Sequence, residues 1–146
     1  MWRIVYLITE LDIGGAENSL YQLLTRLDKE KYSPTVVSLT HRGRVGERLE
    51  EKKIPVICLN MRSKRDLSVF FKLAELLRER KPHILHTYLF HANFIGRIVG
   101  RYLRVPIIIS SVRVMEKERP YHLYLNMLSY WMVDKQVCVS KKVEKF

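Results

Sequence analysis

Adjacent glycines stand where the first apolar run of the chain gives way to a helical pattern. Gly14 and Gly15 follow the apolar residues 3–8 and precede a run of leucines at helical spacing. Adjacent glycines let the backbone pass close to a ligand, and free amides at a helix N-terminus suit a phosphate. The pair can equally form a flexible joint between a strand and a helix. It matches neither the Gly-x-Gly-x-x-Gly dinucleotide fingerprint nor a Walker loop.

A second group of residues that could do chemistry follows a short apolar run at positions 84–85: His86, Tyr88, His91 and Asn93. A lone histidine is more often a hydrogen-bonded structural residue, but two histidines at the end of one strand are candidates for binding or proton transfer. Together with His83 they raise the question of a metal site. No cysteine or carboxylate cluster and no Asp-x-Asp pair accompanies them, so we expect neither a metal nor a cofactor.

The elements that must position these residues alternate along the chain. Apolar, β-prone runs occupy residues 3–8, 35–39, 55–59, 84–86, 105–111 and 135–139, and helical patterns occupy residues 16–27, 45–52, 67–80, 92–103 and 121–133. This order predicts an α/β fold class: a Rossmann-like open, mostly parallel sheet with helices on both faces. Ligands of such sheets bind at the carboxyl ends of the strands. Both groups of residues then lie at that edge, together with Arg113 after the fifth strand and Ser140 after the sixth.

Helical spacing also predicts which side chains are buried. The helix that follows Asp66, its expected N-cap, presents one apolar face: Leu67, Phe70, Phe71, Ala74 and Leu77. The next helix presents Ile95, Ile98, Val99 and Tyr102 to the core, and Gly96 and Gly100 allow it to approach the sheet closely. A row of arginines on the same helix is expected to form a basic surface: Arg97, Arg101 and Arg104.

Charge favours an anionic partner. Lys plus Arg is 26 and Asp plus Glu is 15 over 146 residues, so the formal net charge is 26 − 15 = +11. That excess fits an anionic membrane, a phosphorylated substrate or a nucleic acid. The residues predicted to contact a membrane or another anion are Arg62, Lys64 and Arg65. Two cysteines inside apolar runs, Cys58 and Cys138, indicate reduced thiols in the core. No targeting segment is recognised, so we expect a cytoplasmic protein.

Five segments in order along the chain resemble the glycosyltransferases of GT-B type, and among them family 4, which includes enzymes of lipopolysaccharide, exopolysaccharide and glycolipid synthesis. The segments are residues 13–17 (IGGAE), 84–88 (ILHTY), 91–97 (HANFIGR), 106–113 (PIIISSVR) and 134–140 (DKQVCVS). The resemblance implies that residues 1–146 are the single N-terminal, acceptor-side domain of a metal-independent retaining enzyme. The C-terminal Rossmann domain, which holds the nucleotide sugar, would then be absent from this chain, and the chain alone would lack turnover.

The resemblance also assigns roles. The glycine loop, with Gly14, Gly15 and Glu17, would approach the donor phosphates, and Ser140 follows the sixth strand as in the family. The loop after strand four, with His86, Tyr88, His91 and Asn93, would face the acceptor or the reacting sugar. Tyr88 and Arg113 stand where many members carry histidines. An arginine there can neutralise a phosphate or a sugar carboxylate, so His91 and Arg113 are the candidate catalytic residues.

The expected partners are a nucleotide sugar, a lipid-linked or carbohydrate acceptor, and an anionic membrane surface at the inner face of the cytoplasmic membrane. A basic α/β domain that binds nucleic acid or another polyanion without catalysis is the alternative. No known RNA- or DNA-binding motif is present, which counts against nucleic acid. A regulatory domain of flavodoxin-like type is a third possibility, although such a domain normally ends after five strands.

Overall fold

Six parallel strands form one open sheet in a computed structural model that describes residues 1–12, 14–63, 66–112 and 135–138. The strands are β1 (Trp2–Ile8), β2 (Tyr32–Ser38), β3 (Val56–Cys58), β4 (Ile84–Tyr88), β5 (Ile107–Val112) and β6 (Lys135–Cys138). The described helices are α1 (Gly15–Thr25), α2 (Gly43–Glu51), α3 (Ser68–Arg80) and α4 (Phe90–Tyr102). The α/β class and the Rossmann-like parallel sheet predicted from the sequence are confirmed.

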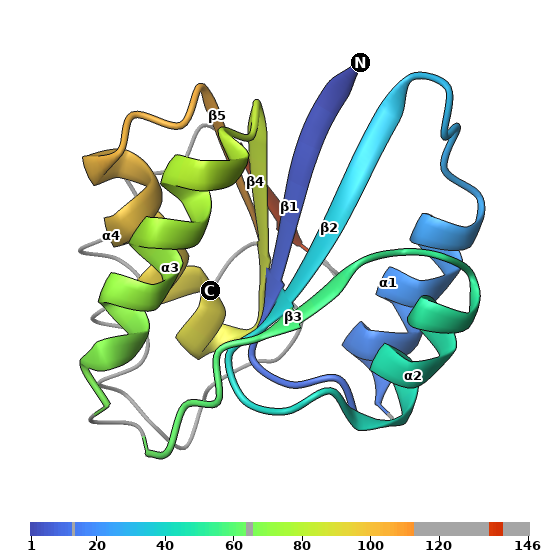
Figure 1. The fold of residues 1–146 in the computed structure, drawn as a ribbon, viewed down its shortest axis with the longest axis horizontal. Helices are drawn as coiled ribbons and strands as arrows, with labels where there is room; N and C mark the ends of the chain where they lie inside the picture. The colour runs from blue at the N-terminus through green and yellow to red at the C-terminus, as the bar shows by residue number, and fades with distance from the viewer. Residues whose placement is uncertain (13, 64–65, 113–134, 139–146) are drawn as a thin grey trace.

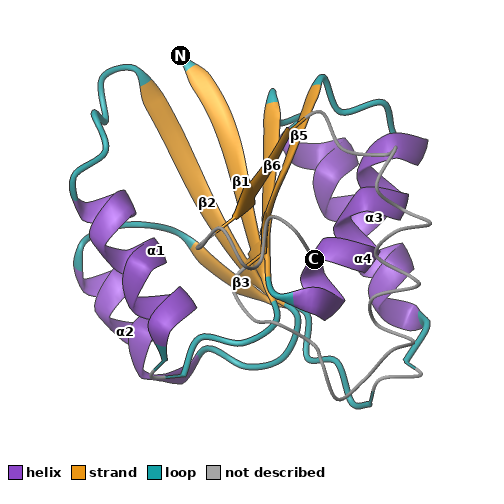
Figure 2. Ribbon diagram, turned by 180° about the vertical axis from the view of Figure 1, so that it is seen from behind, coloured by secondary structure: helices purple, strands orange, loops and turns teal. Residues whose placement is uncertain are grey.

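The order of the strands places a topological switch point between β1 and β4. In space the strands run β3-β2-β1-β4-β5-β6, so the chain moves outward in one direction from β1 and in the other from β4. Helices α1 and α2 cover one face of the sheet, and α3 and α4 cover the other (Figures 1 and 2). Connections that diverge in this way leave room at the carboxyl ends of β1 and β4, where open α/β sheets bind their ligands.

The sheet is buried on both faces, which explains why its strands are apolar runs rather than alternating ones. Val5 and Leu7 of β1 belong to the core on the side of α3 and α4. Tyr6 and Ile8 belong to the core on the side of α1 and α2. Strands β1, β2 and β4 therefore contribute side chains to both cores.

Glycines bring α4 close to the sheet, as predicted. A Cβ atom placed on Gly100 would lie 2.8 Å from Cδ2 of Leu85 and 3.1 Å from Cδ1 of Ile108. At Gly96 it would collide with Cγ2 of Thr87. Residues of β4 and β5 occupy the space that a side chain would need.

The predicted apolar face of α3 is wrong for two residues. Leu67 is 68% exposed and Phe71 is 77% exposed. The buried side chains of this helix are instead Val69, Leu73, Leu76 and Leu77. Because residues two apart on a helix point about 200° away from each other, a core face that contains Val69 leaves Phe71 on the opposite side. Leu67 and Phe71 form an exposed apolar pair.

Two predictions for α4 are also wrong. Tyr102, expected in the core, is 76% exposed, and Arg97, expected on a basic surface, is fully buried. The predicted core residues Ile95 and Val99 are buried. The helix packs against α3 as well as against β4 and β5, so its buried face is wider than one stripe and includes Arg97.

Cys58 matches its prediction in part. It is a free thiol, but it is half-buried rather than fully buried. Burial raises the pKa of this thiol, so the thiolate form is disfavoured.

Candidate functional site

The loop after β1 leads into α1 through Gly14 and Gly15. Gly14 occupies the N-cap position, and its carbonyl oxygen accepts a hydrogen bond from the backbone N–H of Asn18 at 3.0 Å. A Cβ atom on Gly14 would collide with the carboxylate of Glu17, whereas one on Gly15 would meet nothing within 4 Å. A side chain at Gly14 would therefore displace the carboxyl group of Glu17.

Glu17 is buried in the first turn of α1. Burial raises its pKa, a hydrogen bond from its own backbone N–H acts in the opposite direction, and the carboxylates of Glu10 and Asp12 raise it further. The predicted phosphate site at Gly14 and Gly15 thus contains an internal carboxyl group with a raised pKa.

The raised pKa of Glu17 predicts how stability depends on pH. Between the ordinary glutamate pKa, about 4.3, and the raised value, the folded protein keeps a proton that the unfolded chain has released. Raising the pH through this window therefore lowers the free energy of unfolding. We expect Glu17→Gln to remove this fall of the free energy of unfolding with pH. The variant should therefore gain stability relative to the parent as the pH rises, as measured by urea denaturation from pH 4 to 7.

The matched control for this experiment is Glu47→Gln, because Glu47 is an exposed glutamate on α2. Its stability difference from the parent should not change with pH. A pH-independent difference for Glu17→Gln as well would contradict the prediction.

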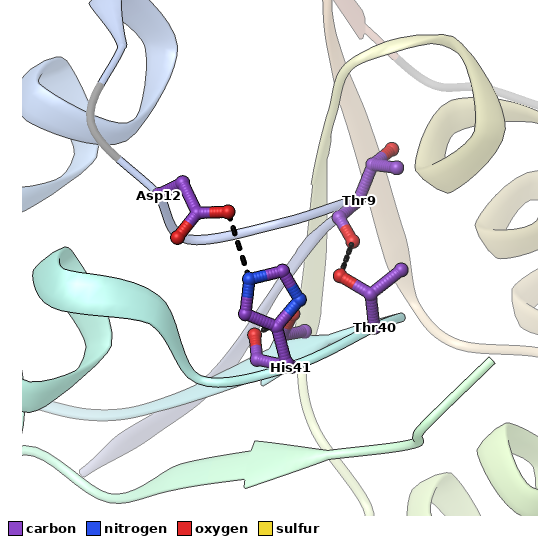
Figure 3. Close-up of polar contacts among 5 residues, drawn as sticks. Thr9, Asp12, Thr40 and His41 are labelled. Carbon is purple, nitrogen blue, oxygen red and sulfur yellow. Dashed lines mark hydrogen bonds and ion pairs between the residues drawn. The ribbon is translucent and has the colours of Figure 1, made fainter. Parts of the chain in front are cut away.

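Two side-chain contacts tie the loop after β1 to the loop after β2 (Figure 3). Oδ2 of Asp12 lies 2.7 Å from Nε2 of His41, and Oγ1 of Thr40 donates to the carbonyl oxygen of Thr9 at 3.0 Å. When His41 is neutral, its contact with the carboxylate places the proton on Nε2 and leaves Nδ1 as an acceptor. Both side chains of this pair are about half exposed, so they can contact a ligand at this edge.

The Asp12–His41 pair was not predicted from the sequence. The signal that could have found it is positional, since each residue follows the carboxyl end of one of two neighbouring parallel strands. Neither residue lies in a recognisable motif, and their 29-residue separation conceals the contact.

The segment after strand four is a sharp turn rather than the predicted loop of residues 86–93. Strand β4 continues to Tyr88, and α4 already begins at Phe90. Leu89 alone connects them, with φ at 72°, a region that non-glycine residues seldom adopt. The backbone N–H of Ala92 donates to Oγ1 of Thr9 at 3.3 Å. The start of α4 is thereby held against the loop after β1, at the switch point between β1 and β4.

His86 lies within β4 rather than in a loop. Its Nε2 is 2.9 Å from Oγ of Ser111 on β5. Its ring lies between two tyrosines, with centroids 5.6 Å from Tyr6 and 4.5 Å from Tyr88. Tyr88 is buried, whereas His86 is half-buried, so of the two only the histidine presents side-chain surface.

The two predicted residues of α4 differ in access. His91 is half-buried in the first turn. Asn93 is buried, and its Nδ2 donates to the carbonyl oxygen of Ser111 at 3.0 Å. Its Oδ1 is buried without a hydrogen-bond partner among the described residues. Asn93 therefore holds α4 against β5.

A buried polar cluster lies beneath this edge of the sheet. Nε of Arg97 donates to Oγ of Ser110 at 3.0 Å, and this hydroxyl is 2.8 Å from Oγ1 of Thr87. The cluster connects α4 to the ends of β4 and β5 and so fixes the strand that carries His86.

The structure thus gathers two groups of candidates at one edge: the glycine loop with Glu17, and the start of α4 with His91. Arg62 is exposed, and its backbone N–H donates to Asp66. The remaining predicted site residues lie outside the described residues: Arg113, Ser140, Lys64 and Arg65. Within the part of the chain that the structure describes, no group of three or more His, Cys, Asp or Glu side chains could hold a metal ion.

Comparison with solved structures places this fold in a class. Anabaena HepE in complex with UDP is 15% identical with a TM-score of 0.81, over 98% of this chain and 39% of that chain. MnaA of S. aureus, solved with UDP, is 18% identical with a TM-score of 0.75, over 99% of this chain and 41% of that chain. The chain therefore has the fold of a Rossmann-like domain of GT-B type, and it spans about 40% of these proteins.

The sequence itself defines the family. The family model of Glycosyltransferase Family 4 matches residues 13–146. A UDP-Gal:alpha-D-GlcNAc-diphosphoundecaprenol alpha-1,3-galactosyltransferase of Escherichia coli is 25% identical over 79 residues, which is 54% of this chain and 20% of that enzyme. The chain belongs to Glycosyltransferase Family 4, and the resemblance seen in its sequence motifs is confirmed.

Proposed function

We propose that this chain is the acceptor-side domain of a retaining glycosyltransferase that moves a sugar from a nucleotide-sugar donor to an acceptor. The observation that carries the proposal is the family match over residues 13–146. The carboxyl ends of β1 and β4 are the proposed place for the chemistry, because the start of α4 is bonded there to Thr9, at the beginning of the loop that leads to the glycines.

A second domain completes the proposed enzyme. The chain spans 39% of HepE and 41% of MnaA, and both of those structures contain UDP. We therefore propose that a C-terminal Rossmann-like domain holds the nucleotide sugar against this edge and that residues 1–146 alone are inactive.

The departing nucleoside diphosphate carries negative charge, which the enzyme must stabilise. We propose a mechanism without a metal ion or another cofactor, in which backbone amides at the start of α1 and Arg113 face the phosphates. Helix N-termini favour negative charge. His91, half-buried at the start of α4, would contact the reacting sugar or the acceptor.

The acceptor is proposed to be lipid-linked or a polysaccharide. Leu67 and Phe71 are exposed at the start of α3, close in sequence to Arg62, and apolar side chains beside basic ones suit an anionic leaflet. The proposed location is the inner face of the cytoplasmic membrane, in cell-envelope polysaccharide synthesis. Among the described helices, none has the length and apolar character to cross a bilayer, so contact would be peripheral.

The test is an assay of the protein translated from the complete reading frame, beside residues 1–146. UDP-galactose, UDP-glucose and UDP-N-acetylglucosamine are offered with and without a diphosphoundecaprenol-linked sugar. We expect transfer only by the longer protein and only with acceptor, and we expect His91→Ala to lower kcat by about 10²-fold or more. The control Gln22→Ala, an exposed change on α1, should be neutral.

The same assay can detect 2-epimerisation of UDP-N-acetylglucosamine, which is another activity found on this fold. UDP-N-acetylglucosamine 2-epimerases, such as that of Neisseria meningitidis bound to UDP-GlcNAc, are also structurally similar, at 12% identity and a TM-score of 0.69 over 98% of this chain and 41% of that chain. Epimerisation of UDP-N-acetylglucosamine without acceptor would replace the transferase proposal.

A further inference from the structure

A basic cavity lies at the edge of the sheet opposite to the candidate site. Its volume is about 530 Å³, and it opens where β1, β4 and β5 begin and where α3 and α4 end. This is the edge that carries the N-terminus, at the top of Figure 1. Half of the lining residues are basic or titratable: Arg3, Arg78, Lys81, His83 and Arg104. The others are leucine, valine or proline, and no carboxylate is among these described lining residues.

The ends of α3 and α4 account for the four cations of this lining but not for His83. Basic residues at a helix C-terminus offset its partial negative charge, which explains Arg78 and Lys81 at the end of α3 and Arg104 just after α4. Arg3 lies in β1, but its Nε donates to carbonyl oxygens at the end of α3, so it also serves this helix end. His83 directly precedes β4 and adds a donor beyond what the helix ends require.

Arg3 and His83 are held in place by hydrogen bonds. Nε of Arg3 donates to the carbonyl oxygens of Arg80 at 3.2 Å and Lys81 at 3.0 Å. The backbone N–H of Arg3 donates to Nδ1 of His83 at 3.0 Å. In the neutral ring the proton of His83 is then on Nε2, which is a donor. The ring of Trp2 packs edge-on against His83, with centroids 5.2 Å apart.

A fixed guanidinium, an oriented imidazole and three further cations form a wall that presents donors and no carboxylate. Such a wall suits an anion, and phosphate is the anion whose oxygens arginine and lysine bind best. A bare phosphate would leave much of the volume empty, and pockets of about 300–1,000 Å³ typically hold small organic ligands. The apolar half of the lining would contact the organic part.

We propose that this cavity is a second ligand site, separate from the transferase edge, that binds the phosphate group of an organic phosphate. The phosphate can belong to a soluble ester or to the headgroup of an anionic lipid. Both share the chemistry that the cavity recognises, and the experiment distinguishes them.

The test is a titration of the ¹⁵N-labelled chain with sodium pyrophosphate, followed by amide chemical shifts. We expect saturable shifts among residues 78–83 and 103–106. The double variant Arg78→Gln/Arg104→Gln should weaken this binding at least tenfold. Both side chains are exposed, so the variant should fold, which its unperturbed spectrum would verify.

The matched control is Arg26→Gln. Arg26 is an exposed arginine at the C-cap of α1, so it has the same relation to a helix dipole without a place in the cavity. It should leave the pyrophosphate affinity unchanged. If Arg26→Gln weakened pyrophosphate binding equally, or if amide shifts were spread over the whole basic surface, net charge alone would explain the binding. Either result would overturn the proposal.

Vesicles separate the two sources of phosphate. The ligand is a lipid headgroup if phosphatidylglycerol vesicles retain the chain and phosphatidylcholine vesicles do not. In that case the double variant should lose vesicle binding, and pyrophosphate should cause little change in the amide shifts. If pyrophosphate binds in the cavity and vesicles do not compete, the ligand is soluble. Shifts only around Gly14 and Gly15, with neither response at the cavity, would refute the site and leave the transferase proposal intact.

Discussion

Gly96→Val should lower the free energy of unfolding by about 3 kcal/mol, at the upper end of the cost of inserting atoms into a packed core. A Cβ atom at this position would collide with Cγ2 of Thr87 and lie 3.0 Å from Cδ2 of Leu7. Both neighbours are fully buried, so neither can move into solvent. Urea denaturation should show a lower midpoint with an unchanged m-value.

The matched control is Gly15→Ala at the first position of α1, where an added Cβ meets nothing within 4 Å. Because alanine restricts the unfolded chain, this variant should gain about 0.4–1 kcal/mol. If Gly96→Val were as stable as the parent, the close approach of α4 to β4 would be refuted.

Arg97→Ala should have an effect of similar size. The side chain is fully buried, and its Nε donates to Oγ of Ser110. Its removal leaves a cavity and takes a partner from a buried hydroxyl, so we expect a loss of about 3 kcal/mol. Thermal and urea unfolding would both measure it.

Two further variants separate volume from charge. Arg97→Met keeps most of the volume and should cost at least about 1 kcal/mol less than alanine, since an apolar replacement of similar size is tolerated better than a void. Arg101→Ala, at an exposed position of the same helix, should change stability by no more than about 0.5 kcal/mol. Equal losses for Arg97→Ala and Arg101→Ala would mean that Arg97 is not in the core.

The elements of the fold could be predicted because each leaves a local signal. Three local patterns indicate packing against another element. They are the apolar runs of a sheet buried on both faces, the leucine spacing of α1 and the paired glycines of α4. Gly96 and Gly100 were therefore predicted to face the sheet, and they do.

What the sequence could not predict depends on contacts between distant elements. Arg97 follows the spacing of Arg101 and Arg104, and only the packing of α4 between α3 and the sheet reveals that it is buried. The exposure of Phe71 depends on the rotation of α3, which a helix with apolar residues on several sides does not specify.

The candidate site shows the same division. Its edge followed from strand order, and the resemblance supplied its residues. The carboxylate of Glu17 beside Gly14, the one-residue turn at Leu89 and the Asp12–His41 pair are products of three-dimensional geometry. Each joins a residue to a neighbour whose position only the folded chain defines.

The ties from Thr9 to Thr40 and from Asp12 to His41 have a consequence for the design of chimaeras. The loops after β1 and β2 form one transplantable unit, although 29 residues separate Asp12 from His41 in the chain. A graft that replaces only the first loop with that of a relative would remove Asp12 and leave His41 without this contact. A graft of both loops together would carry its own supports, so the two loops should be moved as a pair.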